Sequence, residues 1–306
     1  MHYPLDKELC ILQLNKLPLN PNMYPLINML MWMIFSCKSD NEVNVTCLRT
    51  PGYKGASLNT YIIEPKDVKE PLPCLVYFHG GAFMLKASGS HYKIAKEYAK
   101  RLPCKVVYVD YRLAPKHPFP TPAGDCFETY KWVLQNTDIL GIDPNKIFIG
   151  GDSAGGNLAT AVTLMARDKQ LSLPAALLLI YPATDRRMNT KSMQEYTDTP
   201  VWNATLNKMM WDAYLSGKTP KHIEYASPME SSSFAGFPPT YIEVAQYDCL
   251  RDEGILLYER FQEEGIPVEL HEIKNACHGF ETVVNSTITR ECMNRRIEWL
   301  SYLLSL

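Results

Sequence analysis

A short run of small residues around Ser153 has the spacing of an activated serine. Gly151 and Gly155 stand two positions before and two positions after it, in the pattern Gly-x-Ser-x-Gly. A nucleophile on a sharp turn between a strand and a helix has strained backbone angles, and the two elements approach so closely that only very small side chains fit at those positions. The helix that begins there would also point N–H groups toward developing negative charge. The sequence therefore predicts that Ser153 is a nucleophile for acyl transfer.

The same glycines could instead open a helix that cradles a phosphate group. A phosphate-binding loop of the common kind has a Lys directly after its last glycine, and a dinucleotide-binding turn has the spacing Gly-x-Gly-x-x-Gly. The run from Gly150 to Gly156 has neither feature. The serine nucleophile is the better interpretation.

A second glycine-rich run, His79 to Ala82, follows a candidate strand at 72–78. Glycines at a strand exit let the chain turn back and present its N–H groups, which is what stabilisation of an oxyanion requires. We expect the hole to be formed by the backbone N–H groups of Gly81, Ala82 and Ala154, the residue after the serine. An ordinary strand-exit turn is the alternative. We expect His79 to brace this loop rather than to exchange protons.

The elements that must position these residues alternate along the chain between short β-rich runs and amphipathic stretches. Candidate strands are 58–63, 72–78, 105–109, 146–149, 175–180, 240–244 and 268–273. Candidate helices are 91–101, 126–136, 154–168, 254–264 and 287–304. This alternation predicts an α/β fold with a mostly parallel central sheet flanked by helices.

Two regions fall outside the alternation, residues 1–45 and about 184–227. The first contains an apolar run at 23–35, thirteen residues that include Pro25, whereas a membrane span needs about 20. We therefore expect no stable membrane span. As a helix, this run is apolar on every side, so it predicts a helix clamped between the core and a lid.

Five blocks of sequence together resemble one known family. They are His79-Gly80-Gly81-Ala82-Phe83, Asp110-Tyr111-Arg112-Leu113-Ala114-Pro115 with His117-Pro118-Phe119-Pro120, Gly151 to Ala159, Tyr247 to Glu253, and His278-Gly279-Phe280. Over about residues 50–304 the chain resembles the hormone-sensitive-lipase-like esterases of the α/β-hydrolase superfamily, and in particular bacterial acetylesterases. It departs from the family pattern at Ala82, where a third glycine is usual, and at Lys116, where an acidic residue is usual. A positive φ at Ala82 would be costly.

The resemblance implies that Ser153, Asp248 and His278 form a catalytic triad. The residues themselves agree with this assignment. Their order along the chain, serine then acid then histidine, is that of α/β hydrolases. Asp248 follows the candidate strand 240–244, and His278 lies in a loop after 268–273, so both can reach the same edge of a parallel sheet.

Other acids and histidines compete for these roles. Asp252 and Glu253 stand near the start of the helix after Asp248, where we expect them to favour the helix dipole. His271 falls inside a candidate strand, and four further histidines lack a matching strand-end loop: His2, His91, His117 and His222. We therefore prefer Asp248 and His278.

Composition excludes several other classes of protein. Lys and Arg number 31 and Asp and Glu number 33, which gives a formal net charge of −2 without a clustered basic field for nucleic acid. The nine cysteines are an odd number and form no Cys-x-x-Cys pair, so neither a zinc ribbon nor a disulfide framework is indicated. We expect a cytoplasmic protein that uses no cofactor and no metal ion. The two cysteines beside the triad, Cys249 and Cys277, are expected to serve packing.

The sequence thus predicts a serine carboxylesterase that hydrolyses short-chain acyl esters of small molecules through an acyl-enzyme. A serine peptidase and a non-catalytic small-ligand receptor are the alternatives, and a homodimer is compatible with the sequence. Residues 46–306 would form the catalytic domain with a cap insertion at about 184–227, and residues 1–45 a cap segment. These two segments should meet above Ser153. The mean hydropathy of −0.19 gives no sign of an apolar platform for lipid.

Overall fold

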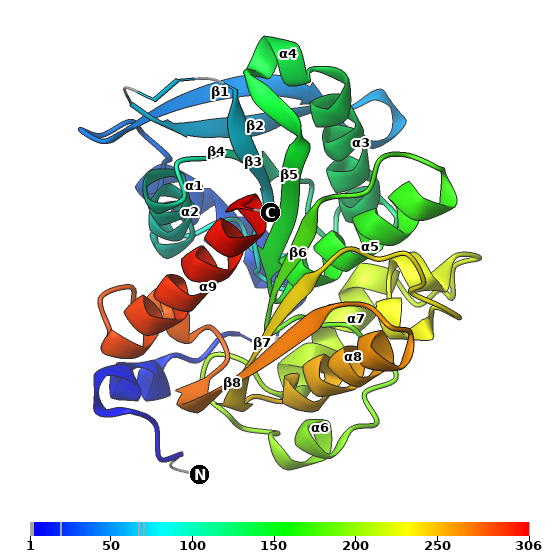
Figure 1. The fold of residues 1–306 in the computed structure, drawn as a ribbon. Helices are drawn as coiled ribbons and strands as arrows, with labels where there is room; N and C mark the ends of the chain where they lie inside the picture. The colour runs from blue at the N-terminus through cyan, green and yellow to red at the C-terminus, as the bar shows by residue number, and fades with distance from the viewer. Residues whose placement is uncertain (1–2, 19, 67, 70, 306) are drawn as a thin grey trace.

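A computed structural model describes residues 3–18, 20–66, 68–69 and 71–305 of the chain. Within these residues, eight strands form one sheet in the order β1-β2-β4-β3-β5-β6-β7-β8 (Figure 1). The strands are β1 Val43–Pro51, β2 Ser57–Pro65, β3 Leu72–Phe78, β4 Lys105–Asp110, β5 Ile142–Asp152, β6 Ala176–Ile180, β7 Thr240–Tyr247 and β8 Val268–Cys277. β2 runs antiparallel to β1 and β4, and the remaining neighbours are parallel.

Helices cover both faces of this sheet. α2 (Gly89–Arg101) and α9 (Thr287–Ser305) lie on one side, and α3 (Thr121–Gln135), α5 (Ala154–Asp168) and α8 (Arg251–Glu263) lie on the other (Figure 1). The shorter helices are α1 Tyr24–Ile34, α4 Thr137–Leu140, α6 Lys191–Glu195 and α7 Ala204–Leu215. Six 3-10 helices are also described: η1 Lys7–Leu14, η2 Pro21–Met23, η3 Tyr53–Gly55, η4 Ile223–Tyr225, η5 Pro228–Glu230 and η6 Phe280–Thr282. The predicted α/β architecture is confirmed.

The central strands β5 and β6 are buried on both faces, which is why their sequences read as continuous apolar runs. Every residue of β6 is buried, and β5 is buried from Ile147 to its end. The rigid middle of the sheet therefore ends where Ser153 begins. β1, which was not predicted, is an edge strand whose residues are mostly exposed or half-buried, so it lacks a clear apolar pattern.

α1 forms over the apolar run, but the expectation that it is clamped on more than one side is wrong. Tyr24 is its single buried residue. Leu26, Leu30, Met33 and Ile34 are all exposed. The fold therefore exposes an apolar surface to solvent that the composition of the chain did not indicate. Among the described helices, none combines the length and the apolarity needed to cross a bilayer.

Candidate active site

The candidate site lies where four parallel strands end. Ser153 directly follows β5, Asp248 follows β7 and His278 follows β8, while the glycine-rich loop after β3 begins at His79. Since β3, β5, β6, β7 and β8 are parallel and adjacent, their carboxyl ends share one edge of the sheet. Residues that are 125 positions apart in the chain, Ser153 and His278, thereby come into hydrogen-bond contact.

The three side chains form one continuous chain of hydrogen bonds. His278 Nε2 lies 2.9 Å from Ser153 Oγ, and His278 Nδ1 lies 2.7 Å from Asp248 Oδ2. The other carboxylate oxygen of Asp248 accepts the Leu250 N–H at 2.9 Å. All three residues are buried. Asp248 is thus held in a position that orients the imidazole, and the imidazole is held against the serine hydroxyl.

The turn at Ser153 has the strained geometry that the glycine spacing predicted. Ser153 has φ 56° and ψ −119°, well outside the conformations that an L-residue prefers. A Cβ atom on Gly151 would lie 2.4 Å from the Gly155 carbonyl carbon, and one on Gly155 would lie 1.9 Å from the Phe78 oxygen. Glycine is therefore required on both sides of the serine by the close approach of β5, α5 and β3.

The loop after β3 lines the same pocket as Ser153. Gly81 has φ 111°, and its carbonyl oxygen accepts the N–H groups of Met84 at 2.9 Å and Leu85 at 2.7 Å. Within the described residues, the N–H groups of Gly81, Ala82 and Ala154 have no hydrogen-bond acceptor. Ala154 is the first residue of α5, so its N–H is one of the unpaired donors at a helix start. The predicted oxyanion donors are therefore free to bind a ligand, and their role in an oxyanion hole stays a prediction.

His79 braces this loop as expected. Its ring stacks on Tyr111 with centroids 4.5 Å apart, and its Nδ1 lies 2.6 Å from the Gly80 oxygen. The Tyr111 hydroxyl donates to the His79 carbonyl oxygen at 2.7 Å. Burial, together with the nearby His91 ring, lowers the pKa of His79 to about 4. The ring is therefore neutral near pH 7 and acts as packing.

A second acid–histidine pair adjoins the serine and was not predicted. His91 Nε2 lies 3.3 Å from Asp152 Oδ2, and Asp152 Oδ1 accepts the Gly80 N–H and the Tyr77 hydroxyl, each at 3.0 Å. Burial opposes charge on Asp152, but His91 and the donor from Gly80 hold its pKa at about 2. Asp152 therefore ties the serine turn to the oxyanion loop. Nothing in the sequence indicated a role for His91 at the site, because this residue lies in α2, two residues after the helix begins, rather than at a strand end.

A buried ionic cluster lies beneath His278. The Arg296 guanidinium pairs with both Glu243 and Glu281, and all three residues are buried. Glu281 also accepts the Tyr181 hydroxyl at 2.7 Å, and the Tyr181 ring lies 4.6 Å from the ring of His278. A chain of contacts therefore runs from α9 to the imidazole, which makes Arg296 and Tyr181 candidates for positioning residues.

A pocket of about 270 Å³ opens over Ser153 and His278. Both regions outside the alternating core contribute to its walls: Leu17, Ile27 and Met31 from the first, and Val201 and Trp202 from the second. The two regions thus reach the same pocket at these residues, and their assignment as a cap stays a prediction.

Other large residues of the second region lie elsewhere. Trp211 and Tyr214 of α7 do not line the pocket, and Tyr214 stacks instead on Phe83 with centroids 3.8 Å apart. α7 therefore supports the oxyanion loop from behind. Trp202 is the aromatic side chain of this region that reaches the pocket, with its ring 6.1 Å from that of His278.

The competing acids have structural roles. Asp252 accepts the Ser192 N–H at 2.8 Å, and the buried Glu253 accepts the N–H groups of Thr184 and Asp185 at 2.7 and 2.9 Å. Burial raises the pKa of Glu253 well above its usual value. Both acids lie in the first turn of α8, as expected, and they also anchor the start of the 184–227 segment to that helix.

The remaining predicted residues lie away from the serine. Lys116 lines a separate basin beside α1. Cys249 and Cys277 are buried beside Asp248 and His278, consistent with packing. In the described part of the chain, no three His, Cys, Asp or Glu side chains are grouped to hold a metal ion.

Comparison with known proteins agrees with this architecture. Residues 75–282 match a family model described as the alpha/beta hydrolase fold. The carboxylesterase NlhH of Mycobacterium tuberculosis is 34% identical over 240 residues, which are 76% of this chain and 74% of that protein. An arylesterase of Saccharolobus solfataricus is 33% identical over 67% of each chain. A solved bacterial heroin esterase superposes with a TM-score of 0.90 at 31% identity and covers 98% of both chains.

Proposed function

Because this chain belongs to the alpha/beta hydrolase family, in its hormone-sensitive-lipase-like branch, we propose that it is a serine carboxylesterase acting on small esters. The observation that carries the proposal is the unbroken contact chain from Asp248 through His278 to Ser153, beside three N–H groups without an acceptor. The similarity to a carboxylesterase and an arylesterase supports ester hydrolysis as the reaction.

In the proposed reaction, Ser153 Oγ attacks the ester carbonyl carbon while His278 Nε2 takes the hydroxyl proton. The carbonyl oxygen becomes an oxyanion that accepts hydrogen bonds from the N–H groups of Gly81, Ala82 and Ala154. Cleavage of the carbon–oxygen bond releases the alcohol, which receives the proton from His278. Water then attacks the acyl-enzyme, gives its proton to the same imidazole, and the acid leaves as Ser153 recovers its hydrogen.

Asp248 holds His278, through its Nδ1, in the tautomer whose Nε2 accepts a proton. Neither a metal nor an organic cofactor has a step in it. Residues 1–45 and about 184–227 act as the cap that closes the site, and residues 46–306 as the catalytic domain. The pocket of about 270 Å³ supports a preference for short acyl groups.

Replacing the serine tests the proposal. Ser153→Ala should lower hydrolysis of p-nitrophenyl acetate by about 10⁴- to 10⁶-fold, because triad members act as a unit, while the protein stays folded. A fluorophosphonate probe should label the wild type and not the variant. Labelling of the wild-type serine without ester turnover would favour a peptidase. A wild type that the probe does not label would favour a ligand receptor. A folded variant that keeps a tenth of the activity would exclude Ser153 as the nucleophile.

A further inference from the structure

The outward side of α1 is an apolar surface that no described part of the chain covers. Leu30, Met33 and Ile34 are 47%, 68% and 70% exposed, and Trp32 beside them is 70% exposed. Large apolar side chains gathered on one exposed helix are uncommon on a protein that works alone in water, and they mark a contact surface. Leaving these side chains exposed to water costs about 0.8 kcal/mol for each methylene group that could be buried.

The orientation of α1 is fixed by its other sides. The Asn28 amide donates to the Met84 oxygen at 2.7 Å and its carbonyl accepts the Lys86 N–H at 2.8 Å, so the helix is fastened to the segment after the oxyanion loop. Ile27 and Met31 line the pocket over Ser153. With these contacts made, the side carrying Leu26, Leu30 and Met33 faces outward, and Ile34 at the last turn is exposed as well.

The charged residues nearest to α1 in the sequence, one on each side, are lysines. No charged residue occurs between Lys16 and Lys38, and both of these lysines are exposed and without a partner among the described residues. Lys and Arg side chains at the ends of an apolar segment can reach past it toward anionic groups. The sequence around α1 therefore combines an apolar face with a cationic border.

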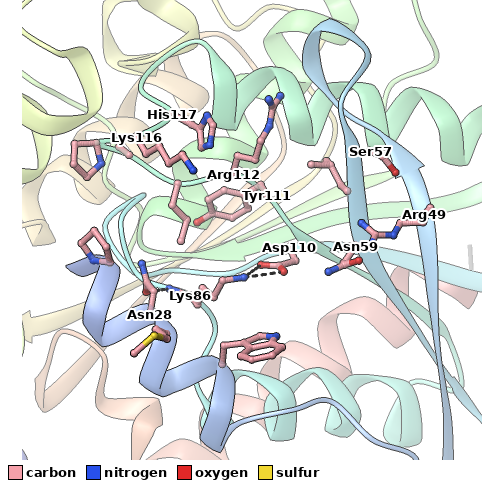
Figure 2. Close-up of a pocket in the computed structure, with 17 residues that line it drawn as sticks. Asn28, Arg49, Ser57, Asn59, Lys86, Asp110, Tyr111, Arg112, Lys116 and His117 are labelled. Atoms are coloured by element: carbon pink, nitrogen blue, oxygen red, sulfur yellow. Dashed lines mark hydrogen bonds and ion pairs between the residues drawn. The ribbon is translucent and has the colours of Figure 1, made fainter. Parts of the chain in front are cut away.

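A basin of about 580 Å³ beside α1 extends that border (Figure 2). Pro25, Met29 and Trp32 of α1 contribute to its wall, while Arg49, Lys86 and Lys116 supply cations. Asp110 is the one acid that lines it, and it pairs with Lys86 at 3.0 Å.

Two further cations of the basin are not paired with an acid in the described part of the chain. Within the described part of the chain, neither Arg49 nor Lys116 has an ion-pair partner, and Figure 2 shows Lys116 extending into the basin. Arg112, in contrast, pairs with Asp125. The uncompensated charge of the basin is therefore cationic.

We infer that α1 and this basin form a docking surface for an anionic lipid–water interface. The apolar side chains of α1 enter the boundary between headgroups and acyl chains, and Arg49, Lys116 and the flanking lysines contact the anionic headgroups. The charge pattern disfavours a second copy of this chain, since a two-fold contact through α1 would bring the same unpaired cations toward one another. Docking would leave Ile27 and Met31 in the wall of the pocket over Ser153.

Vesicle binding tests the inference with the full chain. The wild type should cosediment with vesicles of phosphatidylcholine and phosphatidylglycerol, bind about tenfold less to phosphatidylcholine alone, and release at high salt. The double variant Leu30→Glu, Ile34→Glu should lose at least about tenfold in binding to the anionic vesicles. Lys116→Glu with Arg49→Glu should weaken anionic binding and leave the weak binding to neutral vesicles unchanged.

Ile139→Glu is the matched control, because Ile139 is 85% exposed on α4, away from α1. It should bind like the wild type. Hydrolysis of dissolved p-nitrophenyl acetate by the Leu30→Glu, Ile34→Glu variant should stay within about twofold of wild type, which establishes folding. Vesicle binding needs no turnover, so it is read independently of the proposed function. No wild-type binding, equal loss in Ile139→Glu, or a wild-type dimer that Leu30→Glu, Ile34→Glu dissociates would each overturn the inference.

Discussion

Ala82 holds one of the oxyanion N–H groups in a conformation that suits glycine better. Its φ is 58°, in the left-handed region, where an L-residue is strained by about 1–2 kcal/mol. Its methyl group is buried, and the following residue, Phe83, also has a positive φ. The substitution that separates this chain from the usual family pattern therefore keeps the N–H donor at a cost in stability.

Ala82→Gly should relieve that strain. The gain is offset in part by the greater freedom of glycine in the unfolded chain, so we expect a net stabilisation of up to about 1 kcal/mol by urea unfolding. Esterase activity should stay within about threefold, because the N–H remains. Ala87→Gly is the control, because Ala87 lies in the same segment but has no positive φ. This variant should be less stable than the wild type. A loss of stability in Ala82→Gly equal to that of Ala87→Gly would contradict the strain argument.

His91 is built to hold a proton beside the serine turn. Burial disfavours its charge, but the Asp152 carboxylate outweighs burial and raises the pKa of His91. Ser88 can serve either form, because its N–H lies 3.1 Å from Nδ1 and can donate to the neutral ring, while its hydroxyl lies 2.8 Å away and can accept from the charged ring. The pair therefore persists across a change in protonation, but it is strongest when His91 is charged.

This arrangement gives His91→Gln a pH-dependent cost. A raised histidine pKa adds stability that is complete below its unfolded value of about 6.5 and is lost as pH rises through the folded value. Asp152, with its pKa at about 2, contributes above about 3.9. His91→Gln should thus be less stable than wild type by roughly 1–3 kcal/mol near pH 5, with a smaller gap near pH 9.

Urea unfolding at the two pH values measures this gap. His222→Gln, which removes an exposed histidine paired with Glu224 at the surface, is the control and should change the unfolding free energy by less than about 0.5 kcal/mol at both pH values. A His91→Gln gap that is constant or grows with pH would mean that the pair carries no charge.

The role of a single residue could be predicted from the sequence only where its neighbouring residues indicate that role. Ser153 was accessible because its turn demands glycines at fixed spacing, and Asp248 and His278 because each follows a strand. His91 and Glu281 reach the pocket from α2 and from the 3-10 helix η6, and nothing in their neighbouring sequence marks an inward direction. Their roles come from tertiary contacts alone.

At the scale of elements, α9 is tied to the sheet by more than apolar packing. Arg296, which is fully buried in α9, joins Glu243 of β7 to Glu281 of η6. Removing one partner from a buried ionic cluster leaves uncompensated charge in a medium of low dielectric constant, which costs about 3–5 kcal/mol. In this chain two carboxylates would be stranded, with Tyr181 and His278 directly above them.

Arg296→Ala should therefore lower the free energy of unfolding by at least about 3 kcal/mol, measured with urea at pH 7. In the fraction that remains folded, kcat should fall more than KM changes, because the imidazole loses its support. Arg290→Ala, in the exposed part of the same helix, should alter the unfolding free energy by less than about 0.5 kcal/mol. Equal effects in the two variants would remove Arg296 as a support for the site.

The elements themselves were predictable where the hydrophobic pattern had one interpretation. The strands from β2 to β8 lie where apolar runs were found, with shifts at their ends. α1 was predicted as a helix, but an apolar run that covers all sides of a helix does not say which side faces the core. Its orientation is set by the bonds of Asn28 to Met84 and Lys86, which periodicity does not encode.

The whole molecule combines a small pocket with a much larger outer surface. The pocket over the serine is about 270 Å³ and is lined by residues from both regions outside the alternating core, whereas the open basin on the far side of α1 is about 580 Å³. α1 separates the two. The proposed lipid docking and the proposed preference for short acyl groups are compatible, because the first would determine where the protein works and the second what it cleaves.

The size of the pocket leads to an expected limit on acyl length. Trp202 closes one side, and its indole Nε1 donates to Asn207 at 3.3 Å, which fixes the ring near His278. Each added methylene favours binding by about 0.8 kcal/mol only while it can be buried without displacing a wall. We therefore expect p-nitrophenyl acetate to butyrate to be the best substrates, with octanoate and longer chains at least about tenfold slower in kcat/KM.

Trp202→Leu should shift this limit, because it removes a rigid wall while keeping an apolar side chain. We expect the ratio of kcat/KM for octanoate to that for butyrate to rise at least about tenfold. The ratio is insensitive to any loss of folded protein, which matters because Trp202 is buried. Trp32→Ala, at the exposed indole of the basin, is the control and should leave the ratio unchanged for dissolved substrates. A wild-type optimum at ten carbons or more, or an unchanged ratio in Trp202→Leu, would show that acyl length is set elsewhere than at this wall.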